Sequence, residues 1–202
     1  SLDPEDEYSI ENLIKNINKD IGNLDFVVHA LAYSDKEELK GKYVETSRQN
    51  FLSTLDISTY SFTRISKSAS KIMSNGGSLL TLTYVGSNKT TPNYNVMGVA
   101  KAALETSVKY LSVDLGKNNI RVNAISAGPM KTIAGAAISG ARHVYRYSEK
   151  IAPLQKNPDL KQVGNAALYL LSDISSGVTG LTHYVDGGLK IVGIPNQDLV
   201  SI

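Results

Sequence analysis

Two side chains in the middle of the chain have the types and the spacing of a catalytic pair. Tyr94 and Lys101 lie seven residues apart in the stretch YNVMGVAK. Seven helical residues make almost two turns, so both side chains would share one face, roughly 10 Å apart along the axis. A phenol with a pKa of about 10 is a poor acid or base at neutral pH, and a nearby ammonium favours its ionised form. The spacing indicates a tyrosine assisted by a lysine, or a lysine that binds a cofactor hydroxyl. The alternative is a half-buried tyrosine beside a surface lysine.

The segment 92–115 is expected to be the helix that carries this pair. Thr91 can cap its free N–H groups, and Pro92 suits the first helical position because proline has no N–H to leave unpaired. Gly116 is expected to end the helix.

Other helices and strands alternate with this one along the chain. Apolar residues at spacings of three and four predict a helix over 8–22, and further helices are expected over about 47–74 and 160–172. The last of these opens with Asp159 and Gln162, the side-chain pair of a capping box.

Four mostly apolar runs, rich in β-branched residues, are expected to be strands. Near-continuous apolar runs are typical of a parallel sheet that is covered on both faces. Strands that alternate with helices of this length form right-handed βαβ units. The sequence therefore predicts an α/β fold with a doubly wound parallel sheet, in a single domain spanning 1–202. The expected strands are 25–32, 78–85, 120–126 and 181–186.

Composition excludes several other kinds of protein. The chain has no cysteine and three histidines, which excludes thiolate chemistry and disulfides and argues against a metal site. The formal net charge is only +2, so nothing indicates a nucleic-acid partner. No apolar run approaches the ~18 residues that span a membrane, and the polar, acidic start is unlike a signal peptide. We therefore expect a cytoplasmic protein without membrane insertion.

The start of the chain lacks one element that such a sheet ordinarily has. Dinucleotide-binding sheets begin with a strand and a Gly-rich turn, which binds the pyrophosphate at a helix N-terminus. Here the first residues already form a loop and a helix. Either no dinucleotide is bound, or the first βαβ portion lies outside this chain.

These motifs together resemble the short-chain dehydrogenase/reductase superfamily, and within it the bacterial enoyl-acyl-carrier-protein reductases. Ordinary members of the superfamily space tyrosine and lysine four apart, so the seven-residue spacing favours the enoyl reductase branch. The resemblance covers the chain from Asp3 to about Gly193. It implies a Rossmann-like fold that is N-terminally incomplete here, the cofactor NAD(H), and reduction of a trans-2-enoyl thioester in fatty acid synthesis. The stretches that carry it are AKAALE (100–105), LTLTYVG (80–86), RVNAISAGPMKT (121–132), SDISSGVTG (172–180) and YVDGG (184–188).

The resemblance also implies residue roles. The hydroxyl of Tyr94 would stabilise negative charge on the thioester oxygen, Tyr84 would be a second catalytic tyrosine, and Lys101 would bind the nicotinamide ribose. His29 is expected to be structural. A mobile lid over the acyl chain is implied for 134–141. The implied cofactor contacts are Asp3, Pro4, Leu31, Lys101, Met130, Lys131, Thr132, Ile133 and Ala134. The implied substrate contacts are Tyr33, Ser34, Met97 and Ile138.

Partners follow from the same resemblance. The substrate is an enoyl chain on an acyl carrier protein, and a basic rim would steer this acidic carrier, although a solvated helix face explains the same charges. The two long helices, 47–74 and 92–115, would form the contacts of a homotetramer. The residues of the basic rim are Lys131, Arg142, His143, Arg146 and Lys150.

Two other functions stay open at this point. One is a carbonyl reductase acting on a ketone or an alcohol, against which the Tyr–Lys spacing and Tyr84 argue. The other is a non-catalytic scaffold or decayed paralogue that keeps the fold, against which the retention of Tyr84, Tyr94 and Lys101 argues.

Overall fold

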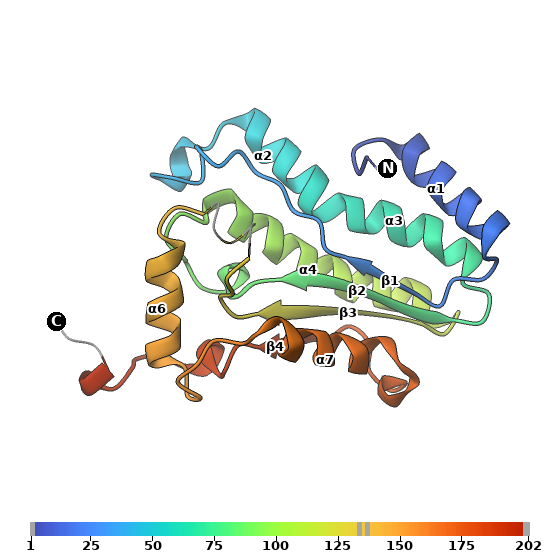
Figure 1. Ribbon diagram of the computed structural model, residues 1–202. Helices are drawn as coiled ribbons and strands as arrows, with labels where there is room; N and C mark the ends of the chain where they lie inside the picture. Colours follow the sequence, from blue (N-terminus) through green and yellow to red (C-terminus); the bar gives the residue numbers. More distant parts are fainter. Residues whose placement is uncertain (1–2, 133–134, 136–137, 200–202) are drawn as a thin grey trace.

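The computed structural model describes residues 3–132, 135 and 138–199. Its centre is a parallel sheet of four strands in the order β1-β2-β3-β4 (Figure 1). All three pairings are parallel, so the four carboxyl ends meet at one edge of the sheet. The predicted Rossmann-like α/β fold is confirmed. The strands are β1 (Phe26–His29), β2 (Gly77–Thr83), β3 (Ile120–Ala127) and β4 (Thr182–Val185).

Helices cover both faces of this sheet. In Figure 1, α3 and α4 lie on one side of the strands and α7 lies on the other, while α6 stands beside the carboxyl edge. The helices are α1 (Glu7–Asp20), α2 (Arg48–Leu55), α3 (Ser61–Ala69), α4 (Asn95–Gly116), α6 (Ala141–Ile151) and α7 (Leu160–Leu171). None of the helices among the described residues is long and apolar enough to span a lipid bilayer.

The alternation of side chains along the strands produces two core layers. Leu79 and Val122 pack on the side of α4, with Leu104 and Val108. Their neighbours in β2 and β3 point to the opposite face and pack against α7. These apolar strands are therefore buried on both faces, as their near-continuous hydrophobicity predicts. The residues of the second layer include Leu80, Ile125, Val163 and Leu170.

The expected helix over 47–74 is present but contains one wide turn. Residues Asp56–Tyr60 form a π-helical turn between α2 and α3, and a 3₁₀ turn (Ser70–Ile72) follows α3. A π turn shifts the helix face by about one residue, and such turns occur often at functional sites. In this turn Ser58 Oγ hydrogen-bonds the backbone of Tyr33 in the loop after β1, and Thr59 Oγ1 donates to the carbonyl oxygen of Ala100 in α4.

The predicted start of the 92–115 helix is wrong. Helix α4 begins at Asn95, and Tyr94 occupies the N-cap position. Asn93 has φ +57°, outside the right-handed helical region, so a regular helix does not extend back through it to Thr91 or Pro92. Tyr94 therefore precedes the helix that carries Lys101.

Helix α7 begins as predicted, whereas α6 is an additional element. The capping box of α7 is present as predicted, with reciprocal hydrogen bonds between Asp159 and Gln162. Helix α6 was not expected as a separate element. Its strongly amphipathic sequence, ARHVYRYSEKI, follows the left-handed Gly140 directly.

Candidate functional site

Two tyrosines meet at the carboxyl edge of the sheet. Tyr84 directly follows β2, and its ring lies edge-to-face on Tyr94, with ring centroids 5.1 Å apart. Tyr94 is 7% exposed and packs with Leu39, Val96 and Met97. The structure therefore brings the two predicted catalytic tyrosines together, with Met97 beside them.

Burial determines the acidity of this pair. It raises the pKa of Tyr94 far above its ordinary value, and the negative forms of Tyr84 and Glu105 add to the effect. Burial also raises the pKa of Tyr84. The expectation that a nearby ammonium would favour the ionised form of Tyr94 is therefore wrong, because desolvation dominates. Tyr94 carries its proton at neutral pH and is a hydrogen-bond donor.

Two glycines allow the tyrosines to approach the backbone. A Cβ at Gly86 would lie 2.5 Å from Cδ1 of Tyr94 and 3.2 Å from Cδ1 of Tyr84. A Cβ at Gly98 would lie 2.8 Å from the carbonyl oxygen of Gly86. The loop after β2 thus fits closely against the first turn of α4. Sequence reasoning did not identify either glycine as a site residue, although both lie in quoted motifs.

Lys101 is buried beside this cluster. It is 6% exposed, and its Nζ donates to the carbonyl oxygen of Leu82 in β2 at 2.8 Å. Burial lowers the pKa of Lys101 to about 8, against the opposing attraction of Glu105. Its neighbour Ala100 packs in the Tyr94 cluster. A buried ammonium at this edge can bind hydroxyl groups of a ligand.

Glu105, one turn further along α4, fixes the Tyr84 loop. Its carboxylate accepts hydrogen bonds from the hydroxyls of Thr83 and Ser87 and, at 3.1 Å, from Asn88 Nδ2. These three donors flank Tyr84 on both sides. Sequence reasoning missed this role. The available signal was a carboxylate four residues after Lys101 on the same helix face.

The loop after β1 forms the next wall of the site. The backbone of Tyr33 exchanges two hydrogen bonds with Ser58 Oγ of the π turn, at 2.9 and 3.0 Å. Ser34 Oγ lies in a network with Asn50 and Thr54 of α2. Tyr33 and Ser34, two of the four predicted substrate residues, are therefore held by the α2 and π-turn segment.

His29 has the structural role that was expected. It is 2% exposed at the end of β1, and its ring nitrogens lie 2.9 Å from Thr81 Oγ1 and 2.8 Å from Ser61 Oγ. Both ring nitrogens are therefore satisfied within the core.

A cleft of about 1060 Å³ lies beyond the carboxyl end of β3. Its lining includes Met130, Lys131, Thr132 and Ile138, four of the predicted site residues. Ile138 also packs in the cluster of Tyr94, so the cleft lies next to the two tyrosines. The predicted Ile133 and Ala134 lie outside the described residues, as do 136–137 of the expected lid.

Three predicted cofactor residues lie elsewhere. Asp3 and Pro4 precede α1, where Asp3 N donates to Ser9 Oγ. Leu31 lines an apolar groove between β1 and α1. Of these three, only Leu31 lies near the carboxyl edge, immediately after β1. Among the described residues, no hydrogen bond joins Asp3 or Pro4 to the tyrosine cluster.

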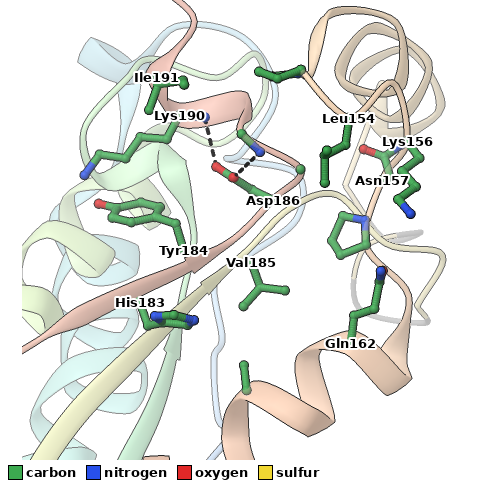
Figure 2. A pocket seen from close by; sticks show the side chains of 15 residues that line it. Leu154, Lys156, Asn157, Gln162, His183, Tyr184, Val185, Asp186, Lys190 and Ile191 are labelled. Carbon is green, nitrogen blue, oxygen red and sulfur yellow. Dashed lines mark hydrogen bonds between the residues drawn. The ribbon is translucent and has the colours of Figure 1, made fainter. Parts of the chain in front are cut away.

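A second cleft at the carboxyl end of β4 contains none of the predicted site residues. It has about 620 Å³ and lies between the end of β4 and the segment before α7 (Figure 2). Figure 2 shows the Asp186 carboxylate receiving hydrogen bonds from the backbone N–H groups of Gly188 and Lys190. The Lys190 ammonium lies 3.6 Å from the ring centroid of Tyr184. These contacts are internal and stabilise the segment after β4.

Comparisons with known proteins agree on one family. The protein-family model described as Enoyl-(Acyl carrier protein) reductase matches residues 1–190. The chain is 54% identical over 200 residues to enoyl-(acyl-carrier-protein) reductase (NADH) 1 of Rhizobium meliloti (strain 1021), covering 99% of this chain and 74% of that protein. It is 47% identical over 191 residues to the NADPH-dependent enzyme FabI of Staphylococcus aureus (strain MRSA252), covering 95% of this chain and 75% of the other.

Solved structures give the same result. The enoyl-(acyl-carrier-protein) reductase of Anaplasma phagocytophilum, in complex with NAD, superimposes with a TM-score of 0.94 at 52% identity, covering 100% of this chain and 75% of that one. FabI of Candidatus Liberibacter asiaticus gives a TM-score of 0.94 at 50% identity, covering 96% and 76%.

Proposed function

This chain belongs to the enoyl-(acyl carrier protein) reductases of the short-chain dehydrogenase/reductase superfamily, and we propose that Tyr94, Tyr84 and Lys101 are its catalytic residues. The reaction is reduction of a trans-2-enoyl chain on an acyl carrier protein in fatty acid synthesis, and the cofactor is NAD(H). The observation that supports the residue roles is the buried tyrosine pair beside Lys101 at the carboxyl edge. This edge is where open α/β sheets bind their ligands.

Tyr94 stabilises the charge that develops during reduction. NADH supplies a hydride to the β-carbon of the enoyl thioester, which leaves negative charge on the thioester oxygen. The phenol of Tyr94 is protonated because burial raises its pKa, and it therefore donates a hydrogen bond to that oxygen. The packing of Tyr84, Gly86 and Met97 fixes the ring before substrate binds, so little reorganisation is needed.

Lys101 and the cleft beyond β3 fit the cofactor. The ammonium of Lys101 is buried next to the cluster around Tyr94. One of its three N–H groups donates to the carbonyl oxygen of Leu82, and the others can donate to a ligand. These donors would bind the hydroxyls of the nicotinamide ribose. Met130, Lys131 and Thr132 line the adjoining cleft, whose size of about 1060 Å³ accommodates a large ligand. These three residues would contact the carboxamide and pyrophosphate.

The carrier protein would dock on the rim of this cleft. Helix α6 places Arg142 and Arg146 at the cleft, and both are exposed, as is Lys131. An acidic carrier would be attracted to such a rim. We place the enzyme in the cytoplasm, where type II fatty acid synthesis supplies this carrier, and assign it a homotetrameric assembly.

The reaction is tested by following NADH oxidation in the natural gene product with a trans-2-enoyl thioester and, in parallel, a 3-ketoacyl thioester. We expect turnover of the enoyl substrate only. Tyr94→Phe and Lys101→Ala should each lower kcat/KM by about 100-fold or more, because one removes the charge-stabilising donor and the other the cofactor contact.

Other outcomes would contradict the assignment. Turnover of the ketone alone would indicate a carbonyl reductase. Inactivity on both substrates in a folded, assembled protein would indicate a scaffold. Full activity of Tyr94→Phe would remove Tyr94 from the mechanism.

A further inference from the structure

The residues on either side of Tyr94 have an unusual backbone conformation. Asn93 has φ +57° and Asn95 has φ +34°, both in the left-handed region. Tyr94 between them has φ −111° and ψ −28°, in the right-handed region. Asparagine tolerates positive φ better than other residues with a side chain, but the conformation still costs free energy. Other contacts must therefore hold this segment in place.

The side chains of the two asparagines supply those contacts. Asn93 Nδ2 donates to the carbonyl oxygen of Ser139 at 2.9 Å. Asn95 Nδ2 donates to the carbonyl oxygen of Leu39 at 3.1 Å, with the carbonyl oxygen of Glu38 at 3.4 Å. The two amides thus bind two loops that are remote from each other in sequence.

Each of these loops also places an apolar side chain in the cluster around Tyr94. Leu39 follows the loop after β1 and is 7% exposed within this cluster. Ile138 directly precedes Ser139, lines the cleft beyond β3 and packs in the same cluster. The amide of each asparagine therefore fixes the loop that supplies one of the packing partners of the tyrosine.

We infer that Asn93 and Asn95 are positioning residues, whose amides lock the two loops against Tyr94 and thereby set the place of its hydroxyl. The inference rests on the proposed role of Tyr94. Their left-handed backbone turns the chain at the start of α4, where the two amides bind the neighbouring loops while the phenol packs in the cluster. Neither side chain is assigned a contact with substrate or cofactor.

The test separates the effect of the side-chain amide from the effect of the left-handed backbone. Glycine accepts positive φ without strain, so Asn93→Gly and Asn95→Gly remove the amide and leave the turn. We expect each to lower kcat with the enoyl thioester by about 10-fold to 100-fold, with less than about a twofold change in KM for NADH. Asn119→Gly is the matched control, because Asn119 also has φ +57° but lies between α4 and β3, at the amino edge of the sheet.

A double-mutant cycle with Tyr94→Phe distinguishes positioning from simple structural support. If the asparagines act through the hydroxyl, Asn95→Gly should cost less than about twofold further in the Tyr94→Phe background. A full, independent loss in that background overturns the inference, as does wild-type kcat in both glycine variants.

A measurement that does not depend on catalysis distinguishes failure of the positioning role from failure of the proposed function. In protein labelled with ¹³C at the tyrosine Cζ atoms, the resonance of Tyr94 is assigned by its loss in Tyr94→Phe. It should shift in Asn93→Gly and Asn95→Gly and stay in place in Asn119→Gly. Failure of the wild type to reduce the enoyl thioester would refute the proposed function, whereas an unmoved Tyr94 resonance would refute the positioning role alone.

Discussion

At the scale of single residues, His29 is a buried titratable group with a strongly lowered pKa. Burial, and secondly the charge of Lys101, lower its pKa from 6.5 to about 4. The folded protein therefore holds this imidazole neutral between these pH values, whereas the unfolded chain binds a proton. Stability linked to His29 is complete above about pH 6.5 and is lost as the pH falls towards about 4.

Acid should accordingly destabilise the protein through this one side chain. We expect the free energy of unfolding in urea to fall by about 3 kcal/mol over this range on account of His29. In His29→Gln the protein should be less stable at neutral pH, but the pH dependence should be flatter by this amount. His143→Gln, at an exposed position on α6, is the control. An unchanged slope in His29→Gln would contradict the assignment.

The residue types of the site were predictable, but their environments were not. The sequence spacing identified Tyr94 and Lys101, and both lie at the carboxyl edge. The protonated state of Tyr94 depends on burial by Leu39 and Ile138, which are far away in the sequence. No local pattern contains that information, and for this reason the expected direction of the pKa shift was wrong.

At the scale of elements, the site depends on how closely the loop after β2 approaches α4. Helix and strand positions were mostly predictable, because the periodicity of apolar residues in the sequence indicates them. The π turn was not, since one additional residue in a turn leaves the periodicity of 47–74 nearly unchanged. The start of α4 was misplaced because Thr91 and Pro92 form a valid local signal, which the left-handed Asn93 overrides.

Gly86 tests the importance of this close approach. Gly86→Ala should displace the Tyr94 ring, because the new Cβ would lie 2.5 Å from its Cδ1. We expect kcat to fall by about 100-fold, together with a loss of stability of about 1–3 kcal/mol. Steady-state kinetics and urea unfolding measure the two effects.

Gly164→Ala is the matched control for that change. Gly164 lies within α7, and a Cβ there would meet nothing within 4 Å. Alanine should therefore leave kcat unchanged and raise helix stability by up to about 1 kcal/mol. Normal kinetics in Gly86→Ala would show that the ring has room to move.

At the scale of the whole molecule, α4 has a second face directed away from the sheet. Tyr110 and Val113 on this face are 73% and 78% exposed, and Tyr60 of the π turn is 54% exposed. Large apolar side chains at such exposure are candidates for a subunit contact. This face lies on the two segments, 47–74 and 92–115, through which we propose that the tetramer forms.

A charge on this face should separate the subunits. Val113→Glu is expected to convert a tetramer into a smaller species, because a carboxylate would be desolvated in the contact. Native mass spectrometry and light scattering measure the change. Lys15→Glu, at an exposed position on α1, should leave the assembly unchanged. A monomeric wild type, or a tetrameric Val113→Glu, would contradict the proposed interface.

The strand order of the sheet also has a consequence for biosynthesis. Neighbouring strands follow one another along the chain from β1 to β4, and each parallel pairing must wait for a long crossover connection. Such pairings are slow to form because they close long loops. During translation each new strand emerges after its partner, so the sheet can grow by addition at one edge. Tyr84 and Tyr94 are synthesised before β3, but the walls beyond β3 and β4 come later. On the ribosome the two phenols are therefore made before the segment beyond β3 that lines the ligand cleft.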